Sequence, residues 1–445
     1  MPIRVGQEVD LVADKRYIQH VRGQSISDAY DVLVELITNA DDSYNRLFRR
    51  KERERDGGDI LVQYLAQRKG QPSKIIVRDR AEGMDSKDME NSLIRMGAYS
   101  SEVGNRGYMG RGAKDCTALG DLTFESIKND KYYRCRITHE LKFVLEMDRK
   151  KATSEDREIL GIIRGNGTAV TLELNQGVRL PRFEHLRVDL PWHFALRDIM
   201  SETSASSILL ENLNSSEKPI RLVYRPPEGR LVIDDFCQAE GYHGATARFK
   251  LWRADEPLPE CKSGSRFERF GILIKGTRAI HECSLLIDEF KTDPHARNYF
   301  GRLECPYIDQ LLSEYEEARS KDFPHPPVNP RLIIDPNRRF GLERTHPFAK
   351  ALIQNPSEKM RALIAKDKQR DKRDSHEIAN QDMRTRLSRL AKLAGRFLRQ
   401  QLDELEELSI GEAADDQAFA QQGVFIYPTY LNVQVSRIRG RTIHS

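Results

Sequence analysis

The chain lacks three features that would place it outside the cell interior or in a membrane. Its six cysteines form no C-x-x-C pair, which argues against a zinc site and against the disulfide framework of a secreted protein. The N-terminal stretch MPIRVGQEVD has no apolar core of a signal peptide, and no apolar run approaches the length of a membrane span. These absences predict a cytoplasmic protein that does not enter a membrane.

The charge balance gives little indication of a partner. The 72 basic residues nearly match the 68 acidic ones, for a net charge of +4 over 445 residues. Basic residues do cluster in RRKERER and KDKQRDKR. Such runs are usually solvated helix faces, and contact with phosphates is the alternative interpretation. The length predicts two or three domains.

Residues 1–178 alternate helical patterns with β-rich runs, which predicts a first domain. A helix over about 27–55 precedes a strand, KIIVRD (Lys74–Asp79). Two further runs form a predicted hairpin around the turn residues Asn129-Asp130, and NGTAVTLELN (166–175) closes the domain as a strand. Helices with a mostly antiparallel sheet predict an α+β fold built as a two-layer α/β sandwich.

Residues 179–355 predict a second α/β domain. Its patterns are a helix in WHFALRDIMS, strands in IRLVYR, ARFKLWR and FGILIKG, and a helix in YIDQLLSEYEEARS. The Pro-rich stretch FPHPPVNPRLIIDPNRRFGLERTHPF follows, and it cannot form a long helix throughout. We interpret it as an ordered connector that carries an arginine cluster.

The last two segments have different patterns. Residues 356–410 predict a long charged helix in which apolar residues recur every three or four positions. Packing within the chain and coiled-coil pairing both fit that pattern. Residues 411–445 alternate apolar and polar residues like one or two strands. Such strands add to an earlier sheet or belong to a further domain of a longer protein.

One helical stretch, DVLVELITNADDSYNRL (Asp31–Leu47), carries an unusual pair of polar residues. Glu35 and Asn39 are four residues apart, so they share one helix face beside the apolar stripe. Asp41 and Asp42 follow directly. Solvent exposure would explain such a pair on its own, so the interpretation depends on the sequence downstream.

Two further pieces of sequence have complementary chemistry. DRAEGM (Asp79–Met84) places a carboxylate at the end of a predicted strand, where it can accept a hydrogen bond from the amine of a base. The glycine that follows lets the base approach the backbone. GYMGRGAK (Gly107–Lys114) is a Gly-rich segment before a helix, where free main-chain N–H groups can bind phosphates. A carboxamide can bind Mg²⁺ and a nearby carboxylate can activate water, so the three pieces together predict an ATP site.

In this order the pieces resemble the motifs of the GHKL ATPases, the superfamily of gyrase, heat-shock chaperone, histidine kinase and MutL. ELITNADDS is similar to the heat-shock chaperone form of the first motif. DRAEGM resembles the second motif, D-x-G-x-G-M, with Ala81 in place of the first glycine. GYMGRGAKD resembles the third, with Lys114 after the last glycine as in the MORC branch, and GTAVTLEL resembles the closing strand. The resemblance covers residues 30–175 and implies a Bergerat-type sandwich that binds ATP.

The resemblance also implies roles for single residues. Glu35 would be the general base, which implies hydrolysis because histidine kinases lack this glutamate; Asn39 would bind Mg²⁺ and Asp79 the adenine amine. A side chain at Ala81 is accommodated if φ there is negative. The segment Tyr99–Gly112 would be a mobile lid. The remaining implied nucleotide contacts are Asp42, Gly83, Met84, Gly107, Gly110, Arg111, Gly112, Lys114 and Thr168.

The second predicted domain resembles the transducer that follows the ATPase module in gyrase, MutL and MORC proteins. There a basic side chain, usually a lysine, reaches the γ-phosphate. Lys275 in ILIKGTR competes for this role with an arginine loop, DPNRRFGLER. We favour the loop, with Arg338 and Arg339 as catalytic candidates and Arg344 as a third, because it follows the last helix of this domain. An arginine can bind phosphate through two hydrogen bonds.

These features predict an ATP-gated homodimeric switch. ATP and Mg²⁺ would close the lid, two N-terminal domains would clamp, with residues 1–25 exchanged as an arm, and slow hydrolysis would reopen them. MORC-like features favour an action on DNA, within a bacterial defence or restriction system. A chaperone-like ATPase that acts on protein clients is one alternative. A catalytically weak nucleotide-sensing scaffold, suggested by Ala81, is the other.

Overall fold

Two β-sheets with packed helices form a mixed α+β fold, in agreement with the predicted class. The structure, a computed structural model, describes residues 20–409 except 22, 51–57, 68–69, 95–111, 262–264 and 336–340. Within the last helix it leaves out the side chains of residues 374–376, 378–380 and 401–409. Two compact units divide the chain after Lys368, and both sheets belong to the first unit.

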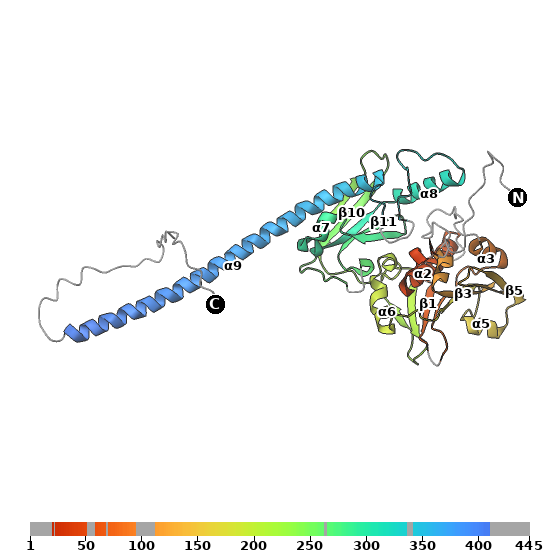
Figure 1. The fold of residues 1–445 in the computed structure, drawn as a ribbon, viewed down its shortest axis with the longest axis horizontal. Helices are drawn as coiled ribbons and strands as arrows, with labels where there is room; N and C mark the ends of the chain where they lie inside the picture. The colour runs from red at the N-terminus through yellow and green to blue at the C-terminus, as the bar shows by residue number, and fades with distance from the viewer. Residues whose placement is uncertain are drawn as a thin grey trace. The chain divides into compact units, whose positions relative to one another are not determined.

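The first sheet has eight strands in the order β5-β4-β3-β6-β2-β1-β7-β8. Strands β1, β3 and β5 of this sheet are labelled in Figure 1. All its neighbouring strands are antiparallel except the parallel pair β1 and β7. The strands are β1 (Asp59–Leu65), β2 (Lys74–Asp79), β3 (Gly120–Lys128), β4 (Lys131–Ile137), β5 (Phe143–Lys151), β6 (Gly167–Leu174), β7 (Ser207–Asn212) and β8 (Ile220–Leu222). The strand expected at β2 is confirmed. Strands β7 and β8 come after the domain boundary expected at residue 178, yet they extend this sheet.

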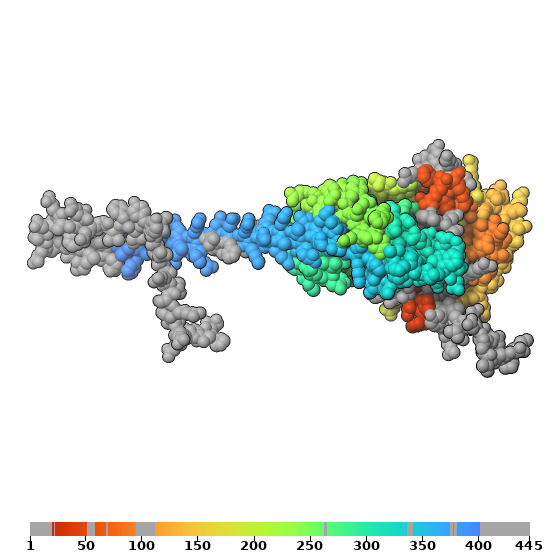
Figure 2. Space-filling view, turned by 90° about the horizontal axis from the view of Figure 1, so that it is seen from above, coloured from red at the N-terminus to blue at the C-terminus, as the bar shows by residue number. Residues whose placement is uncertain are grey.

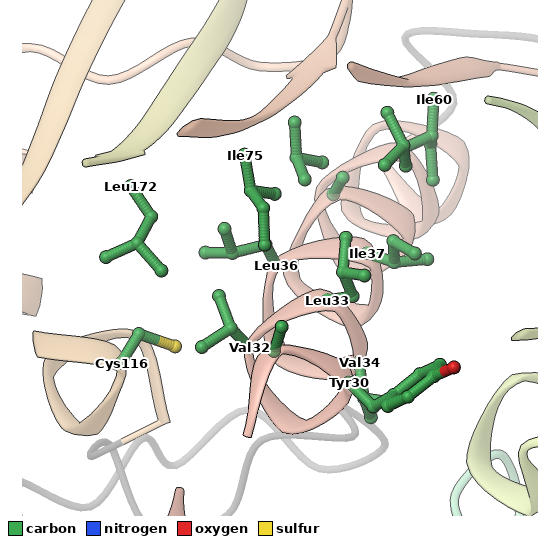
Figure 3. Close-up of a cluster of buried hydrophobic side chains, with 14 of the residues drawn as sticks. Tyr30, Val32, Leu33, Val34, Leu36, Ile37, Ile60, Ile75, Cys116 and Leu172 are labelled. Atoms are coloured by element: carbon green, nitrogen blue, oxygen red, sulfur yellow. The ribbon is translucent and has the colours of Figure 1, made fainter. Parts of the chain in front are cut away.

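Helix α2 (Ala29–Arg49) lies on one face of the first sheet and carries the first motif. It begins where the Asp28 carboxylate accepts hydrogen bonds from the N–H groups of Tyr30 and Asp31. Figure 3 shows its buried side chains facing those of the sheet: Val32, Leu33, Leu36 and Ile37 against Ile60, Ile75 and Leu172. Each such side chain contributes roughly 1.5–3 kcal/mol when fully buried. This packing fixes the rotation of α2 about its axis, and therefore the direction in which Glu35 points.

The predicted hairpin around residues 129 and 130 is confirmed. Strands β3 and β4 pair antiparallel up to Lys128 and Lys131. The two turn residues, Asn129 and Asp130, have φ of 52° and 60°. Two consecutive positive φ values are typical of a type I′ turn, whose twist matches that of the strands, and Asn and Asp tolerate this conformation better than most residues.

The prediction of a helix in WHFALRDIMS is wrong. The chain instead forms two 3₁₀ turns, η2 (Leu190–Trp192) and η3 (Phe194–Leu196), separated by His193 in an extended conformation. Two side-chain hydrogen bonds occupy main-chain groups that an α-helix would pair with each other along its axis. His193 Nδ1 accepts the N–H of Ala195, and the Arg197 guanidinium donates to the Trp192 carbonyl. The other short helices before the second sheet are α3 (Ser86–Leu93), α4 (Gly112–Asp115), η1 (Cys116–Ala118), α5 (Ser154–Leu160) and α6 (Phe183–Asp189).

The second sheet has five strands in the order β12-β11-β13-β10-β9, with β11 and β13 parallel. Its elements are β9 (Arg230–Gln238), β10 (Thr246–Arg253), η4 (Ser265–Phe267), β11 (Gly271–Lys275), β12 (Ile280–Ser284), α7 (Asp288–Lys291), η5 (Pro294–Asn298), β13 (Tyr299–Glu304) and α8 (Tyr307–Ser320). The strands expected at β10 and β11 and the helix expected at α8 are confirmed. This sheet and α8 form a hydrophobic core separate from that of the first sheet.

Helix α9 (Pro347–Ser409) confirms the predicted long helix and begins earlier than expected. A proline is tolerated at the start of a helix because its missing N–H would have no partner there. Up to Ile364 the helix buries one face in the second core, through Phe348, Leu352 and Met360 among others. The part of α9 beyond Lys368 belongs to the second unit, and Figure 2 shows in blue those of its residues whose side chains are described. None of the described helices is long and apolar enough to span a membrane.

Candidate functional site

The first and third motifs meet at Glu35 and Gly112. Glu35 lies on α2 and is only 5% exposed, although it is a carboxylate. Gly112 is the first residue of α4, and a Cβ at that position would lie 1.8 Å from Glu35 Oε2. The carboxylate therefore rests directly against the main chain of the Gly-rich motif. Asn39, one turn further along α2, is exposed, so its amide is open to a ligand from solvent.

Asp79 ends strand β2 with its carboxyl group buried. Its Oδ1 accepts a hydrogen bond from the Ala81 N–H at 2.9 Å. Burial raises the pKa of this carboxyl to about 7, and hydrogen bonds from the N–H groups of Ala81 and Thr168 oppose the rise. At neutral pH the group is therefore close to its titration point, and it can donate or accept a hydrogen bond as a ligand requires.

The turn after Asp79 explains both the substituted and the retained glycine of the second motif. Ala81 is buried and is not among the described residues with positive φ, so its Cβ is compatible with the turn. Gly83 has φ of +67°, and a Cβ there would lie 2.4 Å from the carbonyl oxygen of Ile127. The chain thus needs glycine at the second position only.

Ser126 joins the second motif to the closing strand. Its hydroxyl accepts the N–H of Met84 at 2.7 Å and donates to the Gly167 carbonyl at 2.9 Å. The same oxygen lies 3.2 Å from Thr168 Oγ1, and Thr168 is the β6 partner of Asp79 in the sheet register. The structure therefore brings the expected residues of these two motifs together. Ser126 was not among the predicted site residues. Its only distinguishing feature is that it is a small polar residue at a buried position of β3.

Glu82 ties the same turn to helix α2. Its carboxylate pairs with Arg46 at 2.7 Å and with Arg50 at 2.8 Å, and it accepts the Ser43 hydroxyl at 3.2 Å. Three side chains of one helix face thus hold the turn of the second motif. This role could not be predicted from the sequence, because only the fold brings residues 43–50 close to residue 82.

Lys114 is buried between α4 and α3. Its ammonium donates to the Ser92 carbonyl oxygen at 2.9 Å, and burial lowers its pKa to about 8. The resemblance implies a phosphate contact for Lys114. In this arrangement the ammonium is held by α3, so such a contact would require the side chain to change its partner.

Arg278 links the second sheet to helix α2, and it was not among the predicted site residues. It lies in the turn between β11 and β12, and its guanidinium reaches α2. Nη2 lies 2.6 Å from Asp41 Oδ2 and Nη1 lies 3.0 Å from Asp42 Oδ1, with both carboxylates buried. The Ser206 hydroxyl also donates to Asp41, at 2.7 Å. Asp42, expected to contact nucleotide, is therefore in an ion pair with the second sheet.

The turn that carries Arg278 is held from the other side by Asp309 of α8. The Thr277 N–H donates to Asp309 Oδ2 at 2.7 Å, and a Cβ at Gly276 would lie 2.3 Å from Asp309 Oδ1. Lys275, our competing candidate in this segment, pairs instead with Asp198 at 2.6 Å. The segment ILIKGTR does supply a basic residue that reaches the first motif, but it is the arginine three positions after the lysine.

The arginine loop is described only in part. Arg344 pairs with the buried carboxylate of Glu282 at 2.5 Å, and the Leu342 N–H donates to the same group at 2.7 Å. This arginine is thus held within the second sheet. The expected site residues Arg338, Arg339, Gly107, Gly110 and Arg111 lie outside the described residues, as do the lid up to Arg111, residues 1–19 of the N-terminal arm and the tail from residue 410.

No group of three or more His, Cys, Asp or Glu side chains able to hold a metal ion occurs in the described part of the chain. A Mg²⁺ ion at Asn39 would not need one, because Mg²⁺ commonly takes one or two protein ligands and completes its shell with phosphate oxygens and water. The exposed amide of Asn39 beside Glu35 fits that donor set. Comparisons with protein-family models and with curated protein sequences give no match for this chain.

Proposed function

We propose that the chain binds ATP in a Bergerat-type site and hydrolyses it slowly, as a molecular switch. The observation that carries the proposal is the contact between the buried Glu35 carboxylate and Gly112. A carboxylate against the main chain of a Gly-rich motif has the placement that a general base beside bound phosphates would need. The Asp79 turn supports the proposal from the other end, since it offers a buried carboxyl beside a close-packed glycine.

In this proposal each end of the site has its own task. Asp79, in its ionised form, accepts a hydrogen bond from the adenine amine, and Gly83 and Met84 form the adjoining wall. Thr168 contributes its hydroxyl beside Asp79. Main-chain N–H groups of the Gly-rich motif bind the phosphates.

Glu35 would accept a proton from the water that attacks the γ-phosphate. Asn39 would hold Mg²⁺ through its amide oxygen, and the ion would supply positive charge beside the phosphates. Arg278 would link this end of the site to the second sheet, since it already binds the two acids that follow Asn39.

The switch would act as a homodimer on DNA, within a defence or restriction system, and a chaperone-like action on protein clients is the alternative. The run of cations in α9 supports the DNA proposal, because a basic helix face can bind a phosphate backbone. A fall in duplex DNA binding with rising salt is expected if the proposal holds, whereas a chaperone would bind unfolded protein with little dependence on salt.

The test of the hydrolytic proposal compares two variants that should fail in different ways. Glu35→Gln keeps the shape of the side chain but removes the base, so turnover should fall by roughly 10²–10⁴-fold with ATP binding retained. Asp79→Ala should lose ATP binding itself. Calorimetric binding and steady-state phosphate release measure both quantities. Wild type that binds ATP without turnover would support the nucleotide-sensing scaffold, and wild type that does not bind ATP would overturn the proposal.

A further inference from the structure

The second unit exposes a stripe of large apolar side chains along α9. These side chains each expose between 51% and 64% of their surface: Met383, Leu387, Leu390, Leu393, Phe397 and Leu398. A soluble protein seldom leaves so many large apolar residues in one continuous line, so the stripe is expected to be covered by a partner.

The spacing of the stripe indicates what kind of surface covers it. Met383, Leu387, Leu390, Ala394 and Phe397 are separated by four, three, four and three residues, a repeat of 3.5. That repeat keeps the apolar line facing one partner helix in a supercoil. A helix that lies on a globular surface has no need of it, and a lipid surface has no register that would select it.

Most of the charges beside the stripe lie away from the surface that a second copy would cover. Residues 384–400 carry six cations and no acid, and none of the six forms an ion pair within the described residues. With Leu387 and Ala394 at the a positions, four of the cations fall at the outward c and f positions: Arg389, Lys392, Arg396 and Arg399.

The positions that flank the seam are also compatible with self-pairing. In a parallel pair of identical helices, a g residue of one copy faces the e residue five positions later in the other. Arg386 would face Ala391, and Leu393 would face Leu398. No like charges meet at these two places, and the second of them widens the apolar contact.

We propose that residues 383–398 of α9 form a parallel coiled coil with the same residues of a second copy of this chain. The pairing would make the protein a dimer in the absence of nucleotide. It does not rest on the proposed ATPase activity, because it uses no residue of that site. The outward cations of the two copies would then lie on the outside of one rod.

The first test replaces apolar residues of the stripe and, as a matched control, cations of the opposite face in the same two turns. The molar mass is measured by light scattering without nucleotide, over a hundredfold range of concentration. Wild type and Arg389→Ser/Lys392→Ser should have the mass of two chains. Leu387→Ser/Leu390→Ser should dissociate with a Kd at least about 100-fold higher, because the substitution removes two apolar layers from both helices. Circular dichroism checks that each variant keeps its helix content.

The second test addresses the direction of pairing. In a parallel pair Leu390 meets its own copy, so Leu390→Cys should form an interchain disulfide under mild oxidation. Lys392→Cys, on the outer face, and the wild type with its six native cysteines should not. A dimer in which Leu390→Cys fails to link would overturn the parallel arrangement.

Three other results would overturn the proposal. Wild type that stays a single chain at every concentration would show that the stripe pairs with something else. A stripe variant as dimeric as the wild type would place the dimer contact elsewhere in the chain. A single chain that floats with vesicles of anionic phospholipid, and loses that binding in the stripe variant, would assign the stripe to a membrane surface.

Discussion

The two ends of the candidate site are held together in different ways. The Asp79 end, which consists of Asp79, Gly83, Met84, Ser126 and Thr168, is built from neighbouring strands of one sheet. The Glu35 end depends on side-chain contacts between α2, α4 and the second sheet. Ladder hydrogen bonds make the first end rigid, whereas the second can change when one of its partners moves. This difference fits the proposed function, in which a nucleotide would be recognised at one end and the other end would respond to it.

The largest effect on the Glu35 end of the site is expected from a substitution at Gly112. Gly112→Ala would place a Cβ where the Glu35 carboxylate now lies, so the carboxylate must move away. We expect turnover to fall by roughly 10²–10⁴-fold, as in Glu35→Gln, with little change in the free energy of unfolding, because the end of a glutamate side chain can shift cheaply. Phosphate release and urea unfolding measure the two effects. Gly395→Ala, which would meet no atom within 4 Å, is the control. Full activity in Gly112→Ala would separate Glu35 from the chemistry.

The link to the second sheet is tested by Arg278→Ala. Removal of the guanidinium takes a paired cation away from two buried carboxylates, Asp41 and Asp42. We expect the free energy of unfolding to fall by about 3–5 kcal/mol, measured by urea denaturation. Replacing Asp41 and Asp42 by asparagine in the same variant should recover most of the loss. A variant as stable as the wild type, or one that the asparagines do not rescue, would mean that the ion pair does not hold the two sheets.

The rigidity of the Asp79 end is tested by two glycine substitutions. Gly70 and Gly83 both have positive φ, but a Cβ meets nothing within 4 Å at Gly70 and meets the Ile127 carbonyl oxygen at Gly83. Gly70→Ala should therefore lower the free energy of unfolding by about 1–2 kcal/mol through strain alone. Gly83→Ala should cost about 1–3 kcal/mol more, because the strands must also shift. Equal losses in chemical denaturation would contradict the close packing at Gly83.

The last prediction concerns pH. The folded pKa of Asp79 is raised to about 7, so the folded protein holds a proton that the unfolded chain releases near pH 4. Stability without ligand should therefore fall as the pH rises from about 4 to 7. In the proposed site ATP would bind the ionised form, so its affinity should rise about tenfold between pH 6 and 8 and then level off. Calorimetry on wild type and Asp79→Asn measures this, and an equal pH dependence in the variant would assign it to another group.

Local patterns predicted the parts of this molecule that local forces determine. The strand at Lys74–Asp79, the turn at Asn129-Asp130 and the helix at Tyr307–Ser320 follow from side-chain alternation, turn chemistry and helical period. Within the site, the spacing of Glu35 and Asn39 predicted that they lie on one helix face. The order of the motifs predicted that Asp79 and Thr168 belong to the same site. These are features that a window of a few residues contains.

Contacts between distant segments could not be predicted in the same way. Arg278 binds acids more than 230 positions earlier in the chain, and nothing near it in sequence distinguishes it from Lys275. Ser126 gains its role only because the sheet register aligns it with the second motif, and Glu82 gains its role only because the fold places α2 beside that motif. The same reason applies to β7 and β8, since a strand pattern does not indicate which sheet a strand will join.

The parallel pair of β1 and β7 has a consequence for synthesis of the protein. Gln63 of β1 and Glu211 of β7, joined by a side-chain hydrogen bond, are 148 residues apart in the sequence. A ribosome adds about 5–20 residues per second, so β1 is completed roughly 7–30 s before the strand that covers its edge. During that time the nascent chain carries an unpaired apolar strand edge. The nascent chain therefore needs protection from aggregation between the synthesis of β1 and that of β7.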